Sequence, residues 1–398
     1  MKISFHGAAR TVTGSKHIIH LKNGKKFLLD CGMFQGMGKE TVDLNKDWGF
    51  EPSEITQVIL SHAHIDHIGL LPKLVKDGFT GKIWCTPPTA DLAKVLLLDS
   101  AHIQEADVKY GNRAREKDGR ELLEPLYTEE DAQQVFPLFE TLDYMEKRQI
   151  DDNVELLYTD CGHILGSAAV NLRIKEGAEE TRITFSGDVG RYRDVILRSP
   201  DNFPQADVII LESTYGNSLH DLNTMAADQL LKEITSTCVE QKGKLVIPAF
   251  SLGRTQELLY LLNRLELENR LPDLNYYVDS PMSVQMTEII KRHPECFNKR
   301  VRKLLEKDED VFGFKGLHFI KDVEDSMKLN ESKSPCVIIS ASGMAEAGRV
   351  KHHIKHVIDD AKNTILLVGY CEPNSLGGRL KDGARQVSIF GEQHEVRA

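Results

Sequence analysis

The stretch Ser61-His62-Ala63-His64-Ile65-Asp66-His67 decides how the rest of this sequence is interpreted. It directly follows Gln57-Val58-Ile59-Leu60, whose apolar and β-branched residues predict a short buried strand. A loop that leaves a strand can direct several side chains into one volume, and neutral imidazole and carboxylate groups are good zinc ligands. One histidine after a strand is usually an ordinary loop or core residue. The complete set of four ligand-competent side chains within six residues instead predicts a metal site.

Further donor side chains follow other expected strands. Donors at the ends of several strands can converge on one edge of a sheet core. Hydrolysis of a phosphate ester needs such convergence, because two cations about 3.5–4 Å apart can hold the attacking and leaving oxygens. The further donors are Asp30 after Phe27-Leu28-Leu29, His163 within residues 161–167, Asp188 after residues 182–185 and Glu212 after Ile209-Ile210-Leu211.

The composition is that of a globular protein. Of 398 residues, 41% are hydrophobic and 28% are charged, which excludes a disordered tail, a collagen and a coiled-coil rod. No apolar run approaches the 18 residues or so of a membrane span, and the apolar stretch at the start is too short for a secretory signal. The seven cysteines are scattered and form no Cys-x-x-Cys pair, which favours free thiols and a cytoplasmic location.

The formal net charge is −10, from 50 Lys and Arg against 60 Asp and Glu. This balance argues against a protein that binds polyanions through bulk charge alone. It does not exclude a nuclease, because a local basic groove or bound cations can reverse the field at the site.

The pattern of elements changes near residue 215. The earlier part is rich in short strands and has an expected helix over 91–117. The later part alternates helices with strands, which predicts a parallel sheet flanked by helices. Its expected helices are 225–239, 255–267, 283–292 and 349–358, and its expected strands are 244–247, 275–278, 336–339 and 364–368.

With these motifs in view, the chain resembles the metallo-β-lactamase superfamily and, within it, the β-CASP nucleases. These include bacterial and archaeal RNA nucleases and the endonuclease subunit of the eukaryotic pre-mRNA 3′-end machinery. The resemblance covers nearly the whole chain. It is carried by Gly7–Ser15, Leu29-Asp30-Cys31-Gly32, His62–His67, Gly162–Ser167, Ser186-Gly187-Asp188, Glu212–Gly216, Pro248–Arg254, Asp279-Ser280-Pro281-Met282, Ser340–Met344 and Gly369-Tyr370-Cys371.

The resemblance implies an α/β fold, namely an αβ/βα sandwich interrupted by an inserted α/β β-CASP domain. On this basis we expect the metallo-β-lactamase domain to comprise residues 1–214 and 375–398. The β-CASP domain is expected over 215–374, with the active site in the cleft between the two domains.

The resemblance also implies two zinc ions and a ligand set. His62, His64 and His163 would hold one zinc, Asp66 and His67 would hold the second, and Asp188 would bridge both. Asp30 would orient ligands, and Glu212 matches the first acidic motif of the β-CASP domain. We therefore expect Asp66, Asp188, Glu212 and Asp30 to form the catalytic group. The late histidine that completes the second site in the family has no counterpart before Ala398.

The implied activity is ribonuclease action on single-stranded RNA. Zinc would activate water for in-line attack on phosphorus, with the metals and nearby cations neutralising the developing charge. The residues expected to bind the strand are Ser251, Arg254, Ser340, Ser342, Gly343 and Arg379, of which the 340–343 turn could hold a phosphate through backbone N–H groups. Arg379 can pair with phosphate but cannot donate a proton at neutral pH.

Several alternatives stay open at this point. A DNA-processing β-CASP nuclease and a non-catalytic RNA-binding scaffold share the fold. A small-ester metallohydrolase would not need an insert of this length, and a diiron flavoprotein would have Glu at the position of His64. Endonuclease action, 5′→3′ exonuclease action and a homodimer are all compatible with the sequence.

Overall fold

The computed structural model describes residues 1–36, 40–217, 227–369 and 371–398. The first residues of the expected helix 225–239 and Tyr370 of the last motif lie outside the described residues. The chain packs as two compact units, Met1–Asn217 and Ser218–Ala398. No helix in the described part is both long and apolar enough to cross a membrane.

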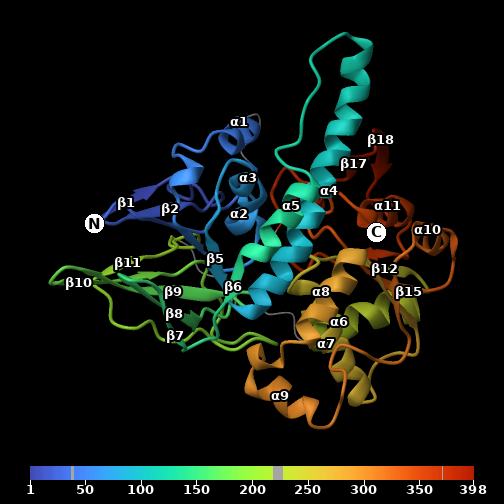
Figure 1. Cartoon of the computed structure of the whole chain (residues 1–398). Helices are drawn as coiled ribbons and strands as arrows, with labels where there is room; N and C mark the ends of the chain where they lie inside the picture. The colour runs from blue at the N-terminus through green and yellow to red at the C-terminus, as the bar shows by residue number, and fades with distance from the viewer. Residues whose placement is uncertain (37–39, 218–226, 370) are drawn as a thin grey trace. The chain divides into compact units, whose positions relative to one another are not determined.

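Unit 1 is built from two sheets that face each other (Figure 1). In the first sheet, β1 to β3 are antiparallel neighbours and β3 to β6 run parallel. In the second sheet only the pair β10–β11 is parallel. The strands of the first sheet are β1 (Lys2–Phe5), β2 (His17–His20), β3 (Lys26–Leu29), β4 (Gln57–Ile59), β5 (Lys82–Cys85) and β6 (Phe139–Thr141). Those of the second are β7 (Lys147–Asp151), β8 (Val154–Asp160), β9 (Ala168–Glu176), β10 (Glu179–Phe185) and β11 (Val208–Ile210).

The inward faces of the two sheets form one hydrophobic core. Phe27 and Ile59 come from the first sheet, whereas Tyr158, Val170 and Phe185 come from the second. All of these side chains are at most 5% exposed, so each strand is fixed in register by the face it buries. The ends of the strands consequently lie at a well-defined edge of the sandwich.

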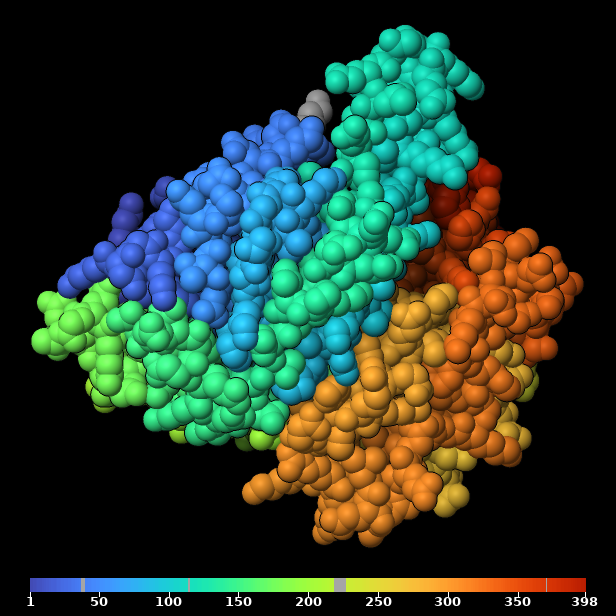
Figure 2. Space-filling view, viewed as in Figure 1, coloured from blue at the N-terminus to red at the C-terminus, as the bar shows by residue number. Residues whose placement is uncertain are grey.

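Helices cover the outer face of the first sheet (Figure 1). The longest, α4, begins where the chain leaves β5, and its far end stands out from unit 1 together with the following loop (Figure 2). The described part of unit 1 has no helix after Leu138. The helices are α1 (Thr41–Lys46), α2 (Ile65–Ile68), α3 (Leu71–Lys76), α4 (Pro87–Lys117) and α5 (Glu129–Val135), with short 3₁₀ turns at Pro52–Glu54 and Phe136–Leu138.

Unit 2 contains the expected parallel sheet, in the order β14-β13-β15-β12-β16. Strands β12 and β15 are buried along their whole length, as continuous runs such as Cys336-Val337-Ile338-Ile339 predict. The strands are β12 (Lys244–Pro248), β13 (Asn275–Asp279), β14 (Leu317–Ile320), β15 (Cys336–Ser340) and β16 (Thr364–Ile365). The helices are α6 (Ala227–Ile234, continued by a π-helical turn over Thr235–Glu240), α7 (Arg254–Leu267), α8 (Pro281–Lys291), a 3₁₀ turn (Pro294–Cys296), α9 (Lys299–Leu305), α10 (Val323–Glu331), α11 (Arg349–Val357) and α12 (Leu376–Lys381).

The last segment packs with unit 2 rather than unit 1. After α12 the chain forms a hairpin, β17 (Gln386–Ile389) with β18 (Glu392–Glu395). Leu376, Val387 and Ile389 are buried against Val350 and Ile354 of α11. The expected domain division ended the second domain at residue 374, whereas this hydrophobic cluster places residues 375–398 in the second compact unit.

Candidate metal centre

The loop after β4 and the short helix α2 present the central donors. His64 precedes α2 in an extended conformation, and its carbonyl accepts the N–H groups of His67 and Ile68 at 2.8 and 3.0 Å. The chain therefore changes from extended to helical at His64. This change places His62 and His64 before the turn, and Asp66 and His67 within it.

Carbonyl groups of α2 hold the helix against the loop that follows β3. Cys31 N–H donates to the carbonyl of His67 at 2.7 Å, and Ser15 N–H donates to the carbonyl of Asp66 at 2.8 Å. At Gly32 a Cβ atom would lie 1.6 Å from the Asp66 carbonyl oxygen, so only glycine permits this approach. Close packing against α2 thus explains why the Leu29–Gly32 motif has glycine at position 32.

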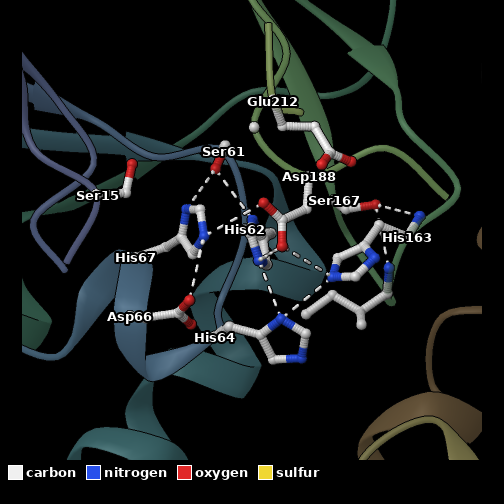
Figure 3. A network of polar contacts seen from close by, with 12 residues as sticks. Ser15, Ser61, His62, His64, Asp66, His67, His163, Ser167, Asp188 and Glu212 are labelled. Atoms are coloured by element: carbon white, nitrogen blue, oxygen red, sulfur yellow. Dashed lines mark hydrogen bonds and ion pairs between the residues drawn. The ribbon is translucent and has the colours of Figure 1, made fainter. Parts of the chain in front are cut away.

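Four donor atoms from three separate segments meet in one place (Figure 3). His64 Nδ1 lies 3.0 Å from His62 Nε2 and 3.2 Å from His163 Nε2. Asp188 Oδ2 lies 3.4 Å from His163 Nε2 and 3.8 Å from His62 Nε2. A tetrahedral zinc with bonds of about 2.0–2.1 Å separates its ligand atoms by about 3.3 Å. The spacing of these four atoms therefore fits one zinc ion.

The three imidazoles of this group favour the neutral form that binds metal. Burial, followed by the neighbouring imidazoles, holds the pKa of His62 well below its usual range. Burial lowers the pKa of His64 to about 3 and that of His163 to about 4. At neutral pH a metal ion would therefore not compete with protons for these nitrogens. It would also give the closely spaced ring nitrogens a common partner.

A second group of donors begins at the other oxygen of Asp188. Asp188 Oδ1 lies 3.4 Å from His67 Nε2, which in turn lies 3.7 Å from Asp66 Oδ2. One carboxylate thus faces both groups, which is the arrangement of a bridging ligand. The first group supplies four donors for one metal ion. Asp188, His67 and Asp66 could hold a second ion beside it.

Asp30 fixes the orientation of His67. It is fully buried, and its Oδ2 accepts from His67 Nδ1 at 2.7 Å, which leaves Nε2 directed at the other donors. Burial alone lowers the pKa of His67, but the carboxylates of Asp30, Asp66 and Asp188, with Asp30 contributing most, together raise it to about 9. Asp30 also accepts from Ser61 N–H at 2.7 Å and from the Ser61 and Ser15 hydroxyls at 2.8 and 3.2 Å. Such outer partners set the tautomer of a metal-binding histidine. The sequence analysis did not identify Ser61 and Ser15 as site residues.

Glu212 positions the loop that carries Asp188. Its carboxylate accepts from Val189 N–H at 3.1 Å, and its own N–H donates to Ser186 Oγ at 3.1 Å. Gly187 between them has φ +54°, and a Cβ there would lie 2.5 Å from Ser61 Cβ. The close fit of this glycine on Ser61 brings Asp188 to the donors of the β4 loop.

The centre is open to solvent on one side. The side chains of Asp188 and His163 are 31% and 27% exposed, although His62 is completely buried. A pocket of about 380 Å³ within unit 1 is lined by His67, Asp188 and Glu212. Structural zinc sites are closed by four protein ligands, whereas catalytic sites keep an open position. The solvent access to this group of donors resembles that of a catalytic zinc site.

The six residues expected to bind substrate all belong to unit 2. Ser251 follows β12, and Ser340 ends the adjacent parallel strand β15, so their loops share one edge of the sheet. Gly343 lies against Phe250, since a Cβ there would be 2.7 Å from the ring. The other three are Ser342 in the loop after β15, Arg254 at the start of α7 and Arg379 in α12. Helix α12 is joined to the loop after β15 by a hydrogen bond from Gly377 N–H to Met344 O at 3.0 Å.

The side chains of this set differ in whether they already have hydrogen-bond or ion-pair partners within the protein. Ser340 is buried and donates its hydroxyl to the Asp279 carbonyl at 2.7 Å, so it serves the packing of the edge. Arg254 pairs with Glu257, and Ser342 Oγ lies 3.4 Å from Ala347 O within its own loop. Arg379 has a buried Nε with no hydrogen-bond partner in the described structure. Their role in substrate binding stays a prediction.

A buried polar network beneath this edge is not evident from the sequence. Asp279 accepts from His353 Nε2 at 2.6 Å, from Ser326 Oγ at 2.5 Å and from Arg349 at 2.7 Å. His353 and Asp279 are fully buried. The only available signal was the spacing of Arg349 and His353, four residues apart on one helix.

Comparisons with known proteins agree with this geometry. A Metallo-beta-lactamase superfamily model matches residues 17–141, and a Beta-Casp domain model matches residues 255–380. The chain is 34% identical to a ribonuclease of Thermus thermophilus over all of its own length and 86% of the relative. It is 31% identical to an RNase J-like protein of Methanocaldococcus jannaschii, over 99% of this chain and 84% of that protein.

A third relative is considerably longer. A transcription termination factor of Methanosarcina mazei is 32% identical over 92% of this chain, which spans 56% of that factor. The first family model includes the His62–His67 motif and the second includes the 340–344 motif, and the first two relatives align along nearly the whole chain. The chain therefore belongs to the β-CASP family of the metallo-β-lactamase superfamily.

Proposed function

We propose that this protein is a zinc-dependent ribonuclease that hydrolyses phosphodiester bonds of single-stranded RNA at a two-metal centre. The observation that carries the proposal is the convergence of His62, His64, His163 and Asp188, whose donor atoms all lie within 4.8 Å of one another. Two relatives named as a ribonuclease and as an RNase J-like protein support RNA as the substrate.

The donor geometry supports a ligand assignment that the family resemblance implies. His62, His64 and His163 would hold the first zinc, Asp66 and His67 the second, and Asp188 would contact both through its two oxygens. When bound, zinc supplies Lewis acidity that activates water and neutralises charge on phosphorus. Imidazole and carboxylate donors suit zinc among the cellular divalent cations, since Mg²⁺ prefers an oxygen shell.

The protein side chains near the metal ions would have two kinds of role, proton transfer and positioning. Asp66, whose side chain is 19% exposed, can orient a water molecule and accept its proton. Asp30 keeps His67 in the binding tautomer, and Glu212 keeps the Asp188 loop in place. Thus Asp30 and Glu212 act as positioning residues, and Asp66 and Asp188 contact the reacting groups.

We further propose that this edge of the unit 2 sheet contributes to strand binding through Ser251, Ser342, Gly343 and Arg379. Arg379 can form charge-assisted hydrogen bonds with a phosphate. The unpaired cysteines, all buried, fit a reducing cytoplasm. A homodimer stays a prediction, which sedimentation equilibrium would test.

The test is cleavage of 5′-labelled and 3′-labelled single-stranded RNA and DNA, with and without a chelator. We expect RNA cleavage that the chelator abolishes and that added zinc restores. A ladder of intermediate fragments indicates endonuclease action, and release of single nucleotides from the 5′ end indicates exonuclease action. Cleavage that persists in chelator, or that is seen with DNA alone, would contradict the proposal.

A further inference from the structure

A groove between α7 and α9 of unit 2 has an unusual charge for this acidic chain. Its volume is about 390 Å³, and it is lined by Arg264, Arg300, Lys303 and Lys307 with a single acidic residue, Glu268. The chain as a whole carries a net charge of −10. The positive lining is therefore a local feature that general composition does not explain.

Three of these cations form a row along α9 and the turn that follows it. Arg300, Lys303 and Lys307 are spaced by three and four residues, which places them on one face about 10 Å long. All three are exposed, and within the described part of the chain none has a carboxylate within ion-pair distance. Arg302 on another face differs, because it donates to the carbonyls of Phe297 and Glu295. The row is thus available for an external anion.

The opposite wall, from α7, does not cancel this charge. Glu268 is shared between Arg264 at 3.3 Å and Arg270 at 2.8 Å, so its carboxylate is already neutralised. Leu267 is 49% exposed at the edge of the groove, and the buried ring of Tyr260 lies below it. The groove therefore combines a line of free cations with an apolar side.

We infer that the α7–α9 groove binds the phosphate backbone of single-stranded RNA, as an additional contact surface for the proposed substrate. This inference rests on the proposed ribonuclease function. A row of charges about 10 Å long suits an extended polyanion better than a small anion, which a single cluster would hold. Exposed apolar surface beside the row suits riboses and bases, as in other proteins that bind single strands.

The test removes the row without reversing its charge. The variant Arg300→Gln/Lys303→Gln/Lys307→Gln is compared with Lys315→Gln/Lys328→Gln/Lys333→Gln, which removes three exposed charges elsewhere in unit 2. Binding of a labelled single-stranded RNA of about 20 nucleotides is measured by fluorescence anisotropy. The metal-loaded protein is used on ice before cleavage begins, and the measurement is repeated in chelator.

We expect the groove variant to bind RNA at least tenfold more weakly near 0.1 M salt, whereas the control triple changes binding less than twofold. Since each contact to a single strand contributes about 0.7 to the slope of log K against log salt, the slope should fall by about 2. Circular dichroism checks folding of both triples. If the groove triple does not fold, Lys303→Gln alone should reduce the slope by about 0.7.

Three results would overturn the inference. These are an equal loss of affinity in both triples, an unchanged slope in a folded groove variant, and displacement of RNA by polyglutamate as effectively as by unlabelled RNA. The last would identify an acidic polypeptide as the ligand. RNA binding that depends on the groove in a chain that cuts no RNA would refute the proposed function alone. RNA cleavage with groove-independent binding would refute only this inference.

Discussion

Each unit contains a buried histidine paired with a buried aspartate, and the two pairs have different consequences. In unit 1, His67 Nδ1 lies 2.7 Å from Asp30, and its Nε2 faces the carboxylates of Asp66 and Asp188. In unit 2, His353 Nε2 lies 2.6 Å from Asp279. Nearly the same contact therefore orients a proposed metal ligand in one unit and occurs within a closed network in the other.

The difference lies in the second ring nitrogen. The second nitrogen of His353, Nδ1, lies 2.7 Å from Asn330 Oδ1, so both ring nitrogens are occupied by protein groups. The second nitrogen of His67 instead lies 3.4 and 3.7 Å from the carboxylate oxygens of Asp188 and Asp66, which is a spacing that a cation between them would complete. We conclude that the partner of the second nitrogen, rather than the aspartate, separates a metal-binding histidine from a structural one.

The largest expected effect is the loss of catalysis when Asp188 is removed. Asp188→Ala deletes the carboxylate that faces both donor groups, so we expect RNA cleavage to fall on the order of 10³-fold or more. The side chain is 31% exposed, and we expect the variant to stay folded. Elemental analysis of bound zinc and a cleavage assay provide the measurement. Full cleavage in a folded variant would contradict the metal centre.

The complementary change in unit 2 should affect stability instead. Asp279→Ala leaves buried His353 and partly buried Arg349 without their shared carboxylate, and breaking such a buried pair typically costs about 3–5 kcal/mol. Chemical denaturation should show this loss in the free energy of unfolding. The zinc content per folded molecule should stay at the wild-type value, and a loss of metal would show that the two networks are coupled.

A smaller effect is expected when the oriented histidine loses its carboxylate. Asp30→Asn keeps the shape of the side chain but weakens its hold on His67, so zinc affinity should fall about 10–100-fold. Competition with a chromogenic chelator measures the zinc dissociation constant.

The matched control is Asp279→Asn, which makes the same chemical change to the other pair. It should leave zinc affinity unchanged, because the side-chain partners of Asp279 (His353, Ser326 and Arg349) all belong to unit 2. Equal losses in both variants would mean that the aspartates act through general stability.

The donors after β4 could be proposed from the sequence because their pattern is local. His62, His64, Asp66 and His67 follow one strand, and a strand end constrains where they point. By contrast, a local pattern does not show which face of a helix is buried. Residues 349–356 have the composition of a basic solvent-exposed helix, yet Arg349 contacts an aspartate 70 positions away. No local pattern encodes that partner.

The same reason explains the elements that were missed. Helix α9 and the hairpin β17–β18 are short, and the expected strand 364–368 is reduced to Thr364–Ile365. Residues 375–398 were expected with the first domain from the resemblance, whereas Leu376 and Ile389 are buried in a cluster of unit 2. Which sheet a short terminal segment packs against depends on tertiary contacts that periodicity does not contain.

The two units also differ in how they accommodate a cation that is largely shielded from solvent. Arg349 in unit 2 has the carboxylate of Asp279, but Lys16 in unit 1 is 1% exposed and is held by the carbonyl oxygens of Gly14 and Gly32 at 3.1 and 2.7 Å. Without a countercharge at that distance, burial lowers the pKa of Lys16 to about 8. Between about pH 8 and the ordinary value of 10.5, the unfolded chain therefore holds a proton that the folded chain has released.

The sign of the pH dependence follows from this difference. Stability rises with pH wherever the unfolded state binds more protons, so the free energy of unfolding should increase across this window by a few kcal/mol at most. Lys16→Met keeps an unbranched chain of similar length and removes the titration, whereas all other groups titrate in both proteins. The wild-type free energy minus that of Lys16→Met, measured by denaturant unfolding at equal zinc content, should therefore climb from pH 8 to pH 10.5. A flat difference would mean that Lys16 stays protonated, and that two carbonyl oxygens stabilise a buried ammonium as well as the carboxylate of unit 2 stabilises Arg349.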